Sequence, residues 1–197
     1  MILNWLNMLA ESFDLPILDW IAANLQSSVM DKIWPIITLF GEGGIFWIAC
    51  AVLMLCFRKT RKAGFSMAVA LLLGVLVCNV TMKPLIARPR PYDYQLEHFG
   101  KEIVLLISRQ SDFSFPSGHT IASFEAATAL LLYKKRIGIP ALILACLIAF
   151  SRLYLYVHYP SDVIFSIVFG IIFGILGTTI VNGIYKKFVR RGKYEKA

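Results

Sequence analysis

Charged residues are scarce in this sequence of 197 residues. They make up 16% of the chain, whereas 58% of the residues are hydrophobic and the mean hydropathy is +0.68. An average soluble domain carries about 25% charged and about 45–50% apolar residues. The composition therefore excludes an ordinary soluble domain and predicts an integral membrane protein. At this length we expect one domain that covers residues 1–197.

The sequence also lacks the cysteine patterns of disulfide frameworks and zinc sites. Its four cysteines all lie inside apolar runs, and no CxxC or Cys/His spacing links them. Nucleic acid binding is not indicated by the net charge of +8, because the basic residues form short clusters between apolar runs. We therefore expect a membrane protein with no bound cofactor and no nucleic acid partner.

Apolar runs near 20 residues long mark membrane-spanning helices. Five such runs are expected to cross, at 44–57, 64–82, 120–133, 138–157 and 163–185. Residues 1–43 are instead expected to lie in the membrane interface as an amphipathic segment, in which Asp14 caps a helix with Ile17, Leu18 and Ile21 on one side. A sixth crossing between residues 15 and 40 stays open. The predicted fold class is all-α, a polytopic bundle of five to six transmembrane helices.

Basic clusters give this bundle a predicted orientation. They occur at 58–62, at 134–136 and between 186 and 193, after the first, third and fifth expected crossings. The positive-inside rule assigns all three to the cytoplasmic side of the cell membrane. The loops at 83–119 and 151–162 then face outward.

Three clusters in those outward loops carry the candidate chemistry. The first holds Lys83 and Arg90, two cations that could bind phosphate oxygens or could equally be cations at headgroup depth. In the second, Ser117 and Gly118 precede an apolar helix, where free backbone N–H groups favour an anion, and His119 follows them.

The third cluster contains Arg152, His158 and Asp162. A histidine nucleophile needs one ring nitrogen free and the other held by an acceptor, and Asp162, four residues after His158, is placed to be that acceptor. Read alone, the pair could also be a simple helix cap. Together the three clusters predict a site that holds a phosphate and cleaves it.

The order and spacing of these clusters resemble the signature of the type 2 phosphatidic acid phosphatase (PAP2) superfamily. The resemblance covers residues 83–162 and implies a small bacterial membrane lipid phosphatase with a fold related to haloperoxidases. It implies that His158 attacks phosphorus, Asp162 orients its ring and His119 protonates the leaving group. The phosphoryl oxygens would then be held by Lys83, Arg90, Ser117, Gly118 and Arg152.

The resemblance implies no metal, and the long loop lacks a carboxylate cluster suited to magnesium. Asp93 and Asp112 of that loop are interpreted as solvated residues and Arg88 as a neighbour of the site. The expected partner is a lipid phosphate or diphosphate, with undecaprenyl diphosphate favoured. Alternatives are a broad phosphatidic acid and phosphatidylglycerol phosphate phosphatase, a non-catalytic lipid-binding protein and a vanadate-dependent haloperoxidase.

Overall fold

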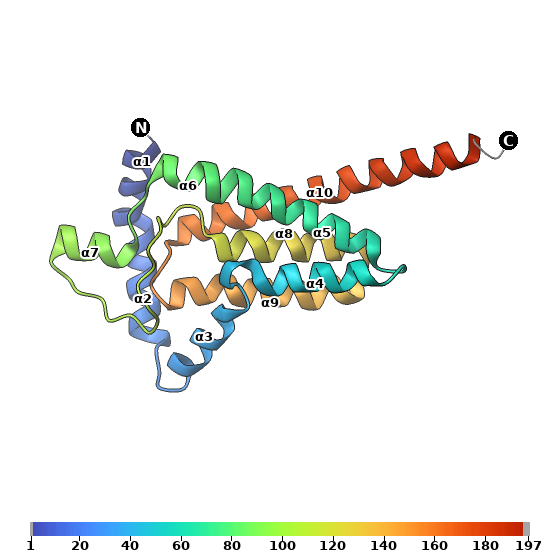
Figure 1. The fold of residues 1–197 in the computed structure, drawn as a ribbon. Helices are drawn as coiled ribbons and strands as arrows, with labels where there is room; N and C mark the ends of the chain where they lie inside the picture. Colours follow the sequence, from blue (N-terminus) through green and yellow to red (C-terminus); the bar gives the residue numbers. More distant parts are fainter. Residues whose placement is uncertain (1, 195–197) are drawn as a thin grey trace.

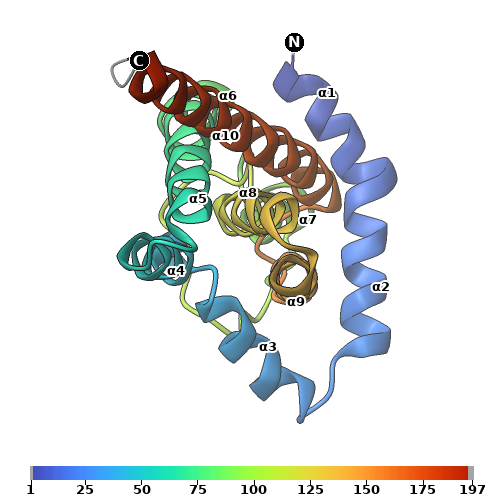
Figure 2. The same cartoon turned by 90° about the vertical axis from the view of Figure 1, so that its right-hand side faces the viewer.

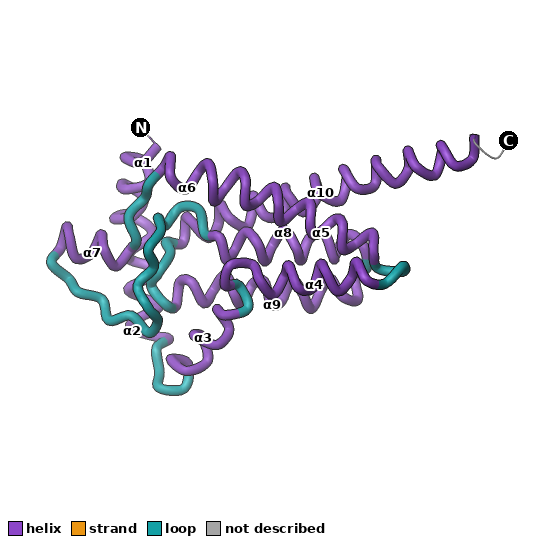
Figure 3. Tube along the Cα trace, viewed as in Figure 1, coloured by secondary structure: helices purple, strands orange, loops and turns teal. Residues whose placement is uncertain are grey.

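The computed structural model describes residues 2–194, and every regular element in that range is a helix (Figure 3). In chain order the elements are α1 (Ile2–Leu9), η1 (Ala10–Asp14), α2 (Leu15–Leu25), α3 (Met30–Leu39), η2 (Glu42–Gly44), α4 (Ile45–Cys56), α5 (Arg61–Gly74), η3 (Val75–Met82), α6 (Lys83–Ile86), α7 (Pro91–Phe99), α8 (Gly118–Tyr133), α9 (Lys135–Tyr154) and α10 (Pro160–Tyr194).

The body of the molecule is a bundle with α8 at its centre. Viewed along the bundle, α5, α9 and α10 surround α8, and α4 lies beside α5 (Figure 2). All residues of α8 from Thr120 to Leu130 are buried except Ala122. Many of them are alanine, serine or threonine, and such small residues let helices approach closely inside a membrane bundle.

Four helical runs are long and apolar enough to cross a membrane, judged by length and composition: Met30–Cys56, Arg61–Phe99, Lys135–Tyr154 and Pro160–Lys187. They include four of the five predicted crossings. The remaining predicted crossing, at 120–133, corresponds to α8. This helix has 16 residues, or about 24 Å of helix, whereas an isolated crossing needs roughly 20 residues. Because α8 is surrounded by α5, α9 and α10, it need not span the full thickness of the hydrocarbon core by itself.

A continuous helical arm, α1–η1–α2, runs crosswise to the bundle at one end (Figures 1 and 2). Leu15, Leu18 and Ile21 of this arm are buried in a cluster with residues of the loop after α9. The prediction that Asp14 caps a helix is wrong, because the chain before it is already helical and its side chain makes no capping hydrogen bond. Asp14 is fully buried instead.

The two ends of the bundle differ in their charge. The basic connections at 57–60 and 134, together with the C-terminal part of α10, lie at one end (Figure 1). The arm, α6, the start of α8 and the loop between α9 and α10 lie at the other. The predicted separation of basic clusters from the candidate site is therefore present in the fold.

We expect Gly174→Ala to destabilise the bundle, because α10 crosses α8 closely at this point. A Cβ atom at residue 174 would lie 2.5 Å from Thr128 Cβ and 2.8 Å from the carbonyl oxygen of Glu125. Overpacking of this kind typically costs about 1–3 kcal/mol, which a lower unfolding temperature in detergent would report. Gly183→Ala is the matched control on the same helix, since its Cβ would meet no heavy atom within 4 Å. Equal melting of both variants would contradict close packing at Gly174.

Candidate active site

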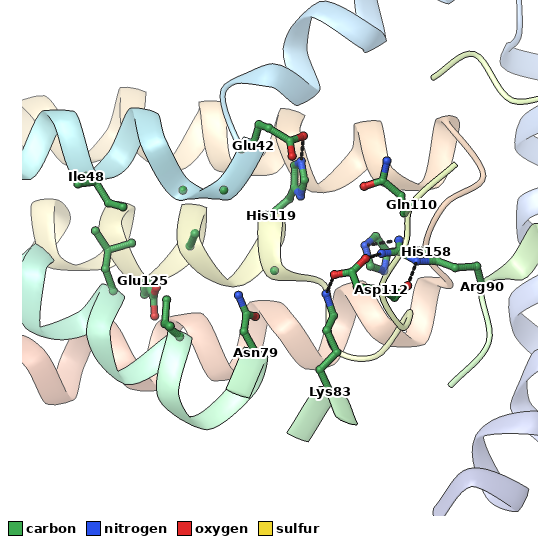
Figure 4. A pocket seen from close by; sticks show the side chains of 17 residues that line it. Glu42, Ile48, Asn79, Lys83, Arg90, Gln110, Asp112, His119, Glu125 and His158 are labelled. Atoms are coloured by element: carbon green, nitrogen blue, oxygen red, sulfur yellow. Dashed lines mark hydrogen bonds and ion pairs between the residues drawn. The ribbon is translucent and has the colours of Figure 1, made fainter. Parts of the chain in front are cut away.

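The three sequence clusters converge at the end of the bundle that the arm covers. Lys83 begins α6, and Arg90 precedes α7, whose first residue Pro91 presets the helical φ angle. His119 lies in the first turn of α8, and His158 lies in the loop between α9 and α10. Figure 4 shows Lys83, Arg90, His119 and His158 around one cavity.

His158 lies between a cation and a carboxylate. Its Nε2 atom is 3.0 Å from Nη1 of Arg90, and its Nδ1 atom is 3.6 Å from Oδ2 of Asp162. The same Asp162 oxygen accepts hydrogen bonds from Ser114 Oγ at 2.5 Å and from the Tyr159 backbone N–H at 3.1 Å. The separation of 3.6 Å is longer than a hydrogen bond, but it places the acceptor on the Nδ1 side. Nε2 is thereby the ring nitrogen on the side of Arg90 and the cavity.

Burial disfavours the protonated imidazole of His158. The side chain is fully buried, and this burial, together with the charges of Arg90 and Arg152, lowers the pKa of His158 well below its ordinary value. A neutral imidazole keeps a nitrogen lone pair, which nucleophilic attack requires.

Lys83 and Arg90 share one carboxylate, that of Asp112. Lys83 Nζ and Arg90 Nη2 each donate to one of its oxygens, and Arg90 Nε donates to the Asp112 carbonyl at 3.0 Å. Partial burial alone would raise the pKa of Asp112, but the hydrogen bond to Lys83 and the two cations lower it below its ordinary value. Asp112 is a half-exposed loop residue, as interpreted, but its pairing with Lys83 and Arg90 was not expected. Its half-exposed carboxylate lies where an anion would meet both cations.

The segment from Ser117 to His119 is split between the cavity and the protein interior. Ser117 is fully buried, and its backbone N–H donates to Ser166 Oγ at 2.8 Å. Gly118 and His119 line the cavity, at the start of a helix where backbone N–H groups have no partner within the helix. His119 Nε2 lies 3.2 Å from Glu42 Oε2. The structure therefore brings Gly118 and His119 to the cavity and leaves the Ser117 N–H engaged elsewhere.

Arg152 lies close to the site, but it is not among the described residues that line the cavity. It is fully buried in α9, and its Nη1 atom donates to Thr38 Oγ1 at 2.6 Å. This contact joins α9 to α3. The positive charge of Arg152 still acts on His158, whose pKa it helps to lower.

The cavity has a volume of about 210 Å³ and extends from the charged groups into the bundle. Ile48 of α4, Val75 of η3 and Ala122 of α8 form apolar parts of its wall. Glu125, in the middle of α8, is buried and also lines it (Figure 4). A cavity that is cationic at one end and largely apolar beyond suits an anion attached to an apolar chain.

Sequence reasoning missed two residues, Arg88 and Asp14, that hold Asp162 on the side away from His158. Arg88, interpreted there as a neighbour, is fully buried and binds Oδ1 of Asp162 through Nη1. Its Nη2 donates to Oδ2 of Asp14 at 2.8 Å. The available signals were a second arginine within Arg88-Pro-Arg90-Pro and an acid, Asp14, flanked by the apolar residues Phe13 and Leu15. Nothing in the spacing links Arg88 to Asp14.

Comparison with known proteins identifies this arrangement. The PAP2 superfamily profile matches residues 62–186, more than half of the chain, and the match includes all three clusters. The chain belongs to the PAP2 superfamily.

Relatives within the superfamily include two undecaprenyl-diphosphatases. The one from Sulfolobus acidocaldarius is 36% identical over 119 residues, which cover 60% of this chain and 55% of the relative. Undecaprenyl-diphosphatase BcrC from Bacillus subtilis is 32% identical over 142 residues, which cover 72% of this chain and 70% of the relative. The chain thus spans about half the length of the archaeal relative.

A solved PAP2 structure shares the fold. The crystal structure of the transmembrane PAP2 type phosphatidylglycerolphosphate phosphatase from Bacillus subtilis matches with a TM-score of 0.64 and 27% identity. The match covers 90% of this chain and 86% of that structure. These likenesses confirm the predicted all-helical, PAP2-type fold of an integral membrane protein.

We expect Asp112→Asn to strengthen the binding of inorganic phosphate several-fold. The carboxylate of Asp112 competes for Lys83 and Arg90, and a neutral amide competes less for two cations. Titration calorimetry of the purified protein with phosphate would measure the change. Asp93→Asn is the matched control, because Asp93 pairs with Arg109 at the surface. Weaker phosphate binding in Asp112→Asn would mean that Asp112 holds the two cations in place rather than competing for them.

Proposed function

We propose that this protein is a lipid phosphatase that removes phosphate from a membrane lipid through a phosphohistidine on His158. One observation carries the proposal. His158, with Asp162 on its Nδ1 side, shares a cavity with the cations Lys83 and Arg90 at one end of an apolar bundle.

In the first step, Arg90 Nη1 turns from His158 Nε2 to the bound phosphate. The freed Nε2 lone pair attacks phosphorus, and the bond from phosphorus to the leaving oxygen breaks. His119 donates a proton to that oxygen, which departs as an alcohol or as a lipid phosphate. Asp162 stabilises the positive charge that develops on the His158 ring. The positions of both histidines on the cavity wall, with Glu42 Oε2 3.2 Å from His119 Nε2, support these roles.

In the second step, His119, now without its proton, takes one from a water molecule. The water oxygen attacks phosphorus, the bond between phosphorus and His158 Nε2 breaks, and inorganic phosphate leaves. This exchange returns the proton to His119 and the lone pair to His158. The two histidines are therefore restored for the next cycle.

The phosphoryl oxygens would be held mainly by Lys83, Arg90 and the backbone at Gly118. Lys83 supplies a point charge and Arg90 a planar fork. The contacts of both with the Asp112 carboxylate support joint binding of an anion. Ser117 and Arg152 complete the proposed set. In the structure they bind Ser166 and Thr38 instead, so their contribution would be through the Ser117 hydroxyl and the charge of Arg152.

Among lipid phosphates, undecaprenyl diphosphate is the substrate we favour. The names of the two relatives support it, and so does the apolar wall of the cavity formed by Ile48, Val75 and Ala122. The proposed location is the cytoplasmic membrane of a cell, with the site on the outer face. The basic connections at the opposite end of the bundle support that orientation.

The test is phosphate release by the purified protein in detergent from undecaprenyl diphosphate, phosphatidic acid and phosphatidylglycerol phosphate. We expect the diphosphate to be hydrolysed and His158→Ala to reduce turnover by roughly a thousand-fold or more. Comparable release from all three lipids would indicate a broad lipid phosphatase instead. No release from any lipid by folded protein would favour a non-catalytic lipid-binding protein. Retained activity of His158→Ala would exclude His158 as the nucleophile.

We also expect full activity in excess EDTA. The two carboxylates nearest the proposed nucleophile are already engaged, Asp162 with Arg88 and Asp112 with Lys83 and Arg90. Among the described residues, no three His, Cys, Asp or Glu side chains gather as ligands of a metal ion would. Rates of phosphate release measured after dialysis against EDTA, with and without added Mg²⁺, check this expectation. A strict requirement for Mg²⁺ would contradict the proposed mechanism.

A further inference from the structure

Asp14, on the N-terminal arm, reaches the rear of the active site. Its Oδ2 atom accepts hydrogen bonds from Arg88 Nη2 at 2.8 Å and from Ser161 Oγ at 2.7 Å. Its Oδ1 atom accepts one from the Ser161 backbone N–H at 2.8 Å. Asp14 and Arg88 are both fully buried. The arm is therefore joined to the first turn of α10, where Asp162 lies.

Arg88 divides its guanidinium fork between two acids. Nη2 binds Asp14, whereas Nη1 binds Asp162 Oδ1 and Ser161 Oγ. The guanidinium carbon is 3.6 Å from the centre of the Tyr159 ring, which fixes the plane of the fork. Arg88 takes Oδ1 of Asp162, while Oδ2 accepts from Ser114 Oγ and the Tyr159 N–H and lies on the side of His158 Nδ1.

Loss of Asp14 would change what Arg88 can do. An arginine facing a single carboxylate tends to bind both of its oxygens. Arg88 would then compete with Ser114 Oγ and the Tyr159 N–H for Oδ2 of Asp162 and shift the charge of this carboxylate away from His158. It would also cancel the charge of Asp162. With Asp14 present, two carboxylates share one guanidinium, and one net negative charge remains to face the His158 ring.

We infer that Asp14 is a positioning residue, which keeps the Arg88 fork divided so that the charge of Asp162 stays directed at His158. This inference rests on the proposed function, because it assigns the charge of Asp162 to a step that His158 performs. It connects the N-terminal arm to the proposed chemistry through the side chain of Asp14 alone. Asp14 touches no substrate and acts through Arg88 and Asp162.

A simpler role for Asp14 would be to dock the arm. Asp19 provides the matched control for that role, because it lies on the same arm and accepts hydrogen bonds from Tyr156 at 2.8 Å and Lys101 at 2.9 Å. It ties the arm to the loop that carries His158 but does not contact Arg88. A variant that only loosens the arm should therefore resemble Asp19→Asn.

The first experiment compares Asp14→Asn with Asp19→Asn in the purified full-length protein. We expect Asp14→Asn to lower kcat by about 10- to 100-fold, the usual size for a group that orients a functional side chain. KM and inhibition by inorganic phosphate should not change, because Lys83 and Arg90 are intact. Asp19→Asn should keep wild-type kcat. Unchanged kcat in Asp14→Asn, or an equal loss in both variants, would overturn the inference.

A double-mutant cycle with Asp162→Asn tests whether Asp14 acts through Asp162. In that background, Asp14→Asn should cause no further loss of kcat. A further loss of the same factor as in the wild type would show an independent role and overturn the inference.

If Asp14→Asn does not fold, Ser161→Ala decides. It removes the hydroxyl that joins Asp14 to Arg88 with little loss of volume. A several-fold fall in kcat at constant KM supports the inference, and an unchanged kcat overturns it.

His158→Ala distinguishes a failure of the proposed mechanism from a failure of the proposed role of Asp14. If His158→Ala remains active, the proposed mechanism fails. If it is inactive while Asp14→Asn is fully active, the role of Asp14 alone fails.

Discussion

The site depends on one buried ion cluster, in which Arg88 lies between Asp14 and Asp162. An isolated charge inside a membrane protein costs several kcal/mol unless partners and hydrogen bonds surround it. Here three distant segments supply them: the N-terminal arm, the segment that precedes α7 and the first turn of α10. None of the three can move alone without exposing an unpaired charge to an apolar interior. The cluster therefore fixes how these segments lie relative to one another, and with them the carboxylate behind His158.

The cavity side of the site is built in the opposite way. Lys83 and Arg90 face a carboxylate, that of Asp112, but this partner is half-exposed and belongs to a loop without regular structure. A half-exposed carboxylate can leave for water at little cost, whereas a fully buried one cannot. The buried pairs of Arg88 with Asp14 and Asp162 are thus costly to separate. The pairing of Asp112 with Lys83 and Arg90 is exchangeable. A site arranged in this way can hold His158, the proposed nucleophile, in place and still accept an anion from outside.

The sequence predicted those parts of the site that lie at the ends of long apolar helices. Hydropathy locates the helix ends, and the residue types found there, as at His119, His158 and Asp162, indicate the chemistry. Pairing between distant segments was not predictable. Asp14 and Arg88 are 74 residues apart, and only the tertiary fold brings them together. The same holds for the bond from Arg152 to Thr38 and for the bond from the Ser117 N–H to Ser166. Motif chemistry names the residues that a site uses, while their partners depend on packing.

Helix α8 links this packing to the depth of the site. Its 16 residues give about 24 Å of helix, against a hydrocarbon core of about 30 Å. If Lys134 and Lys135 lie at one interface and α8 runs along the membrane normal, its first turn would lie about one helical turn below the other surface. His119 is in that turn, and the cavity extends from it along Ala122 to Glu125. A phosphate bound there would lie just below the headgroup layer. The apolar chain attached to it could stay within the bilayer, and for this reason a short, protein-shielded central helix suits a phosphatase whose substrate is a lipid.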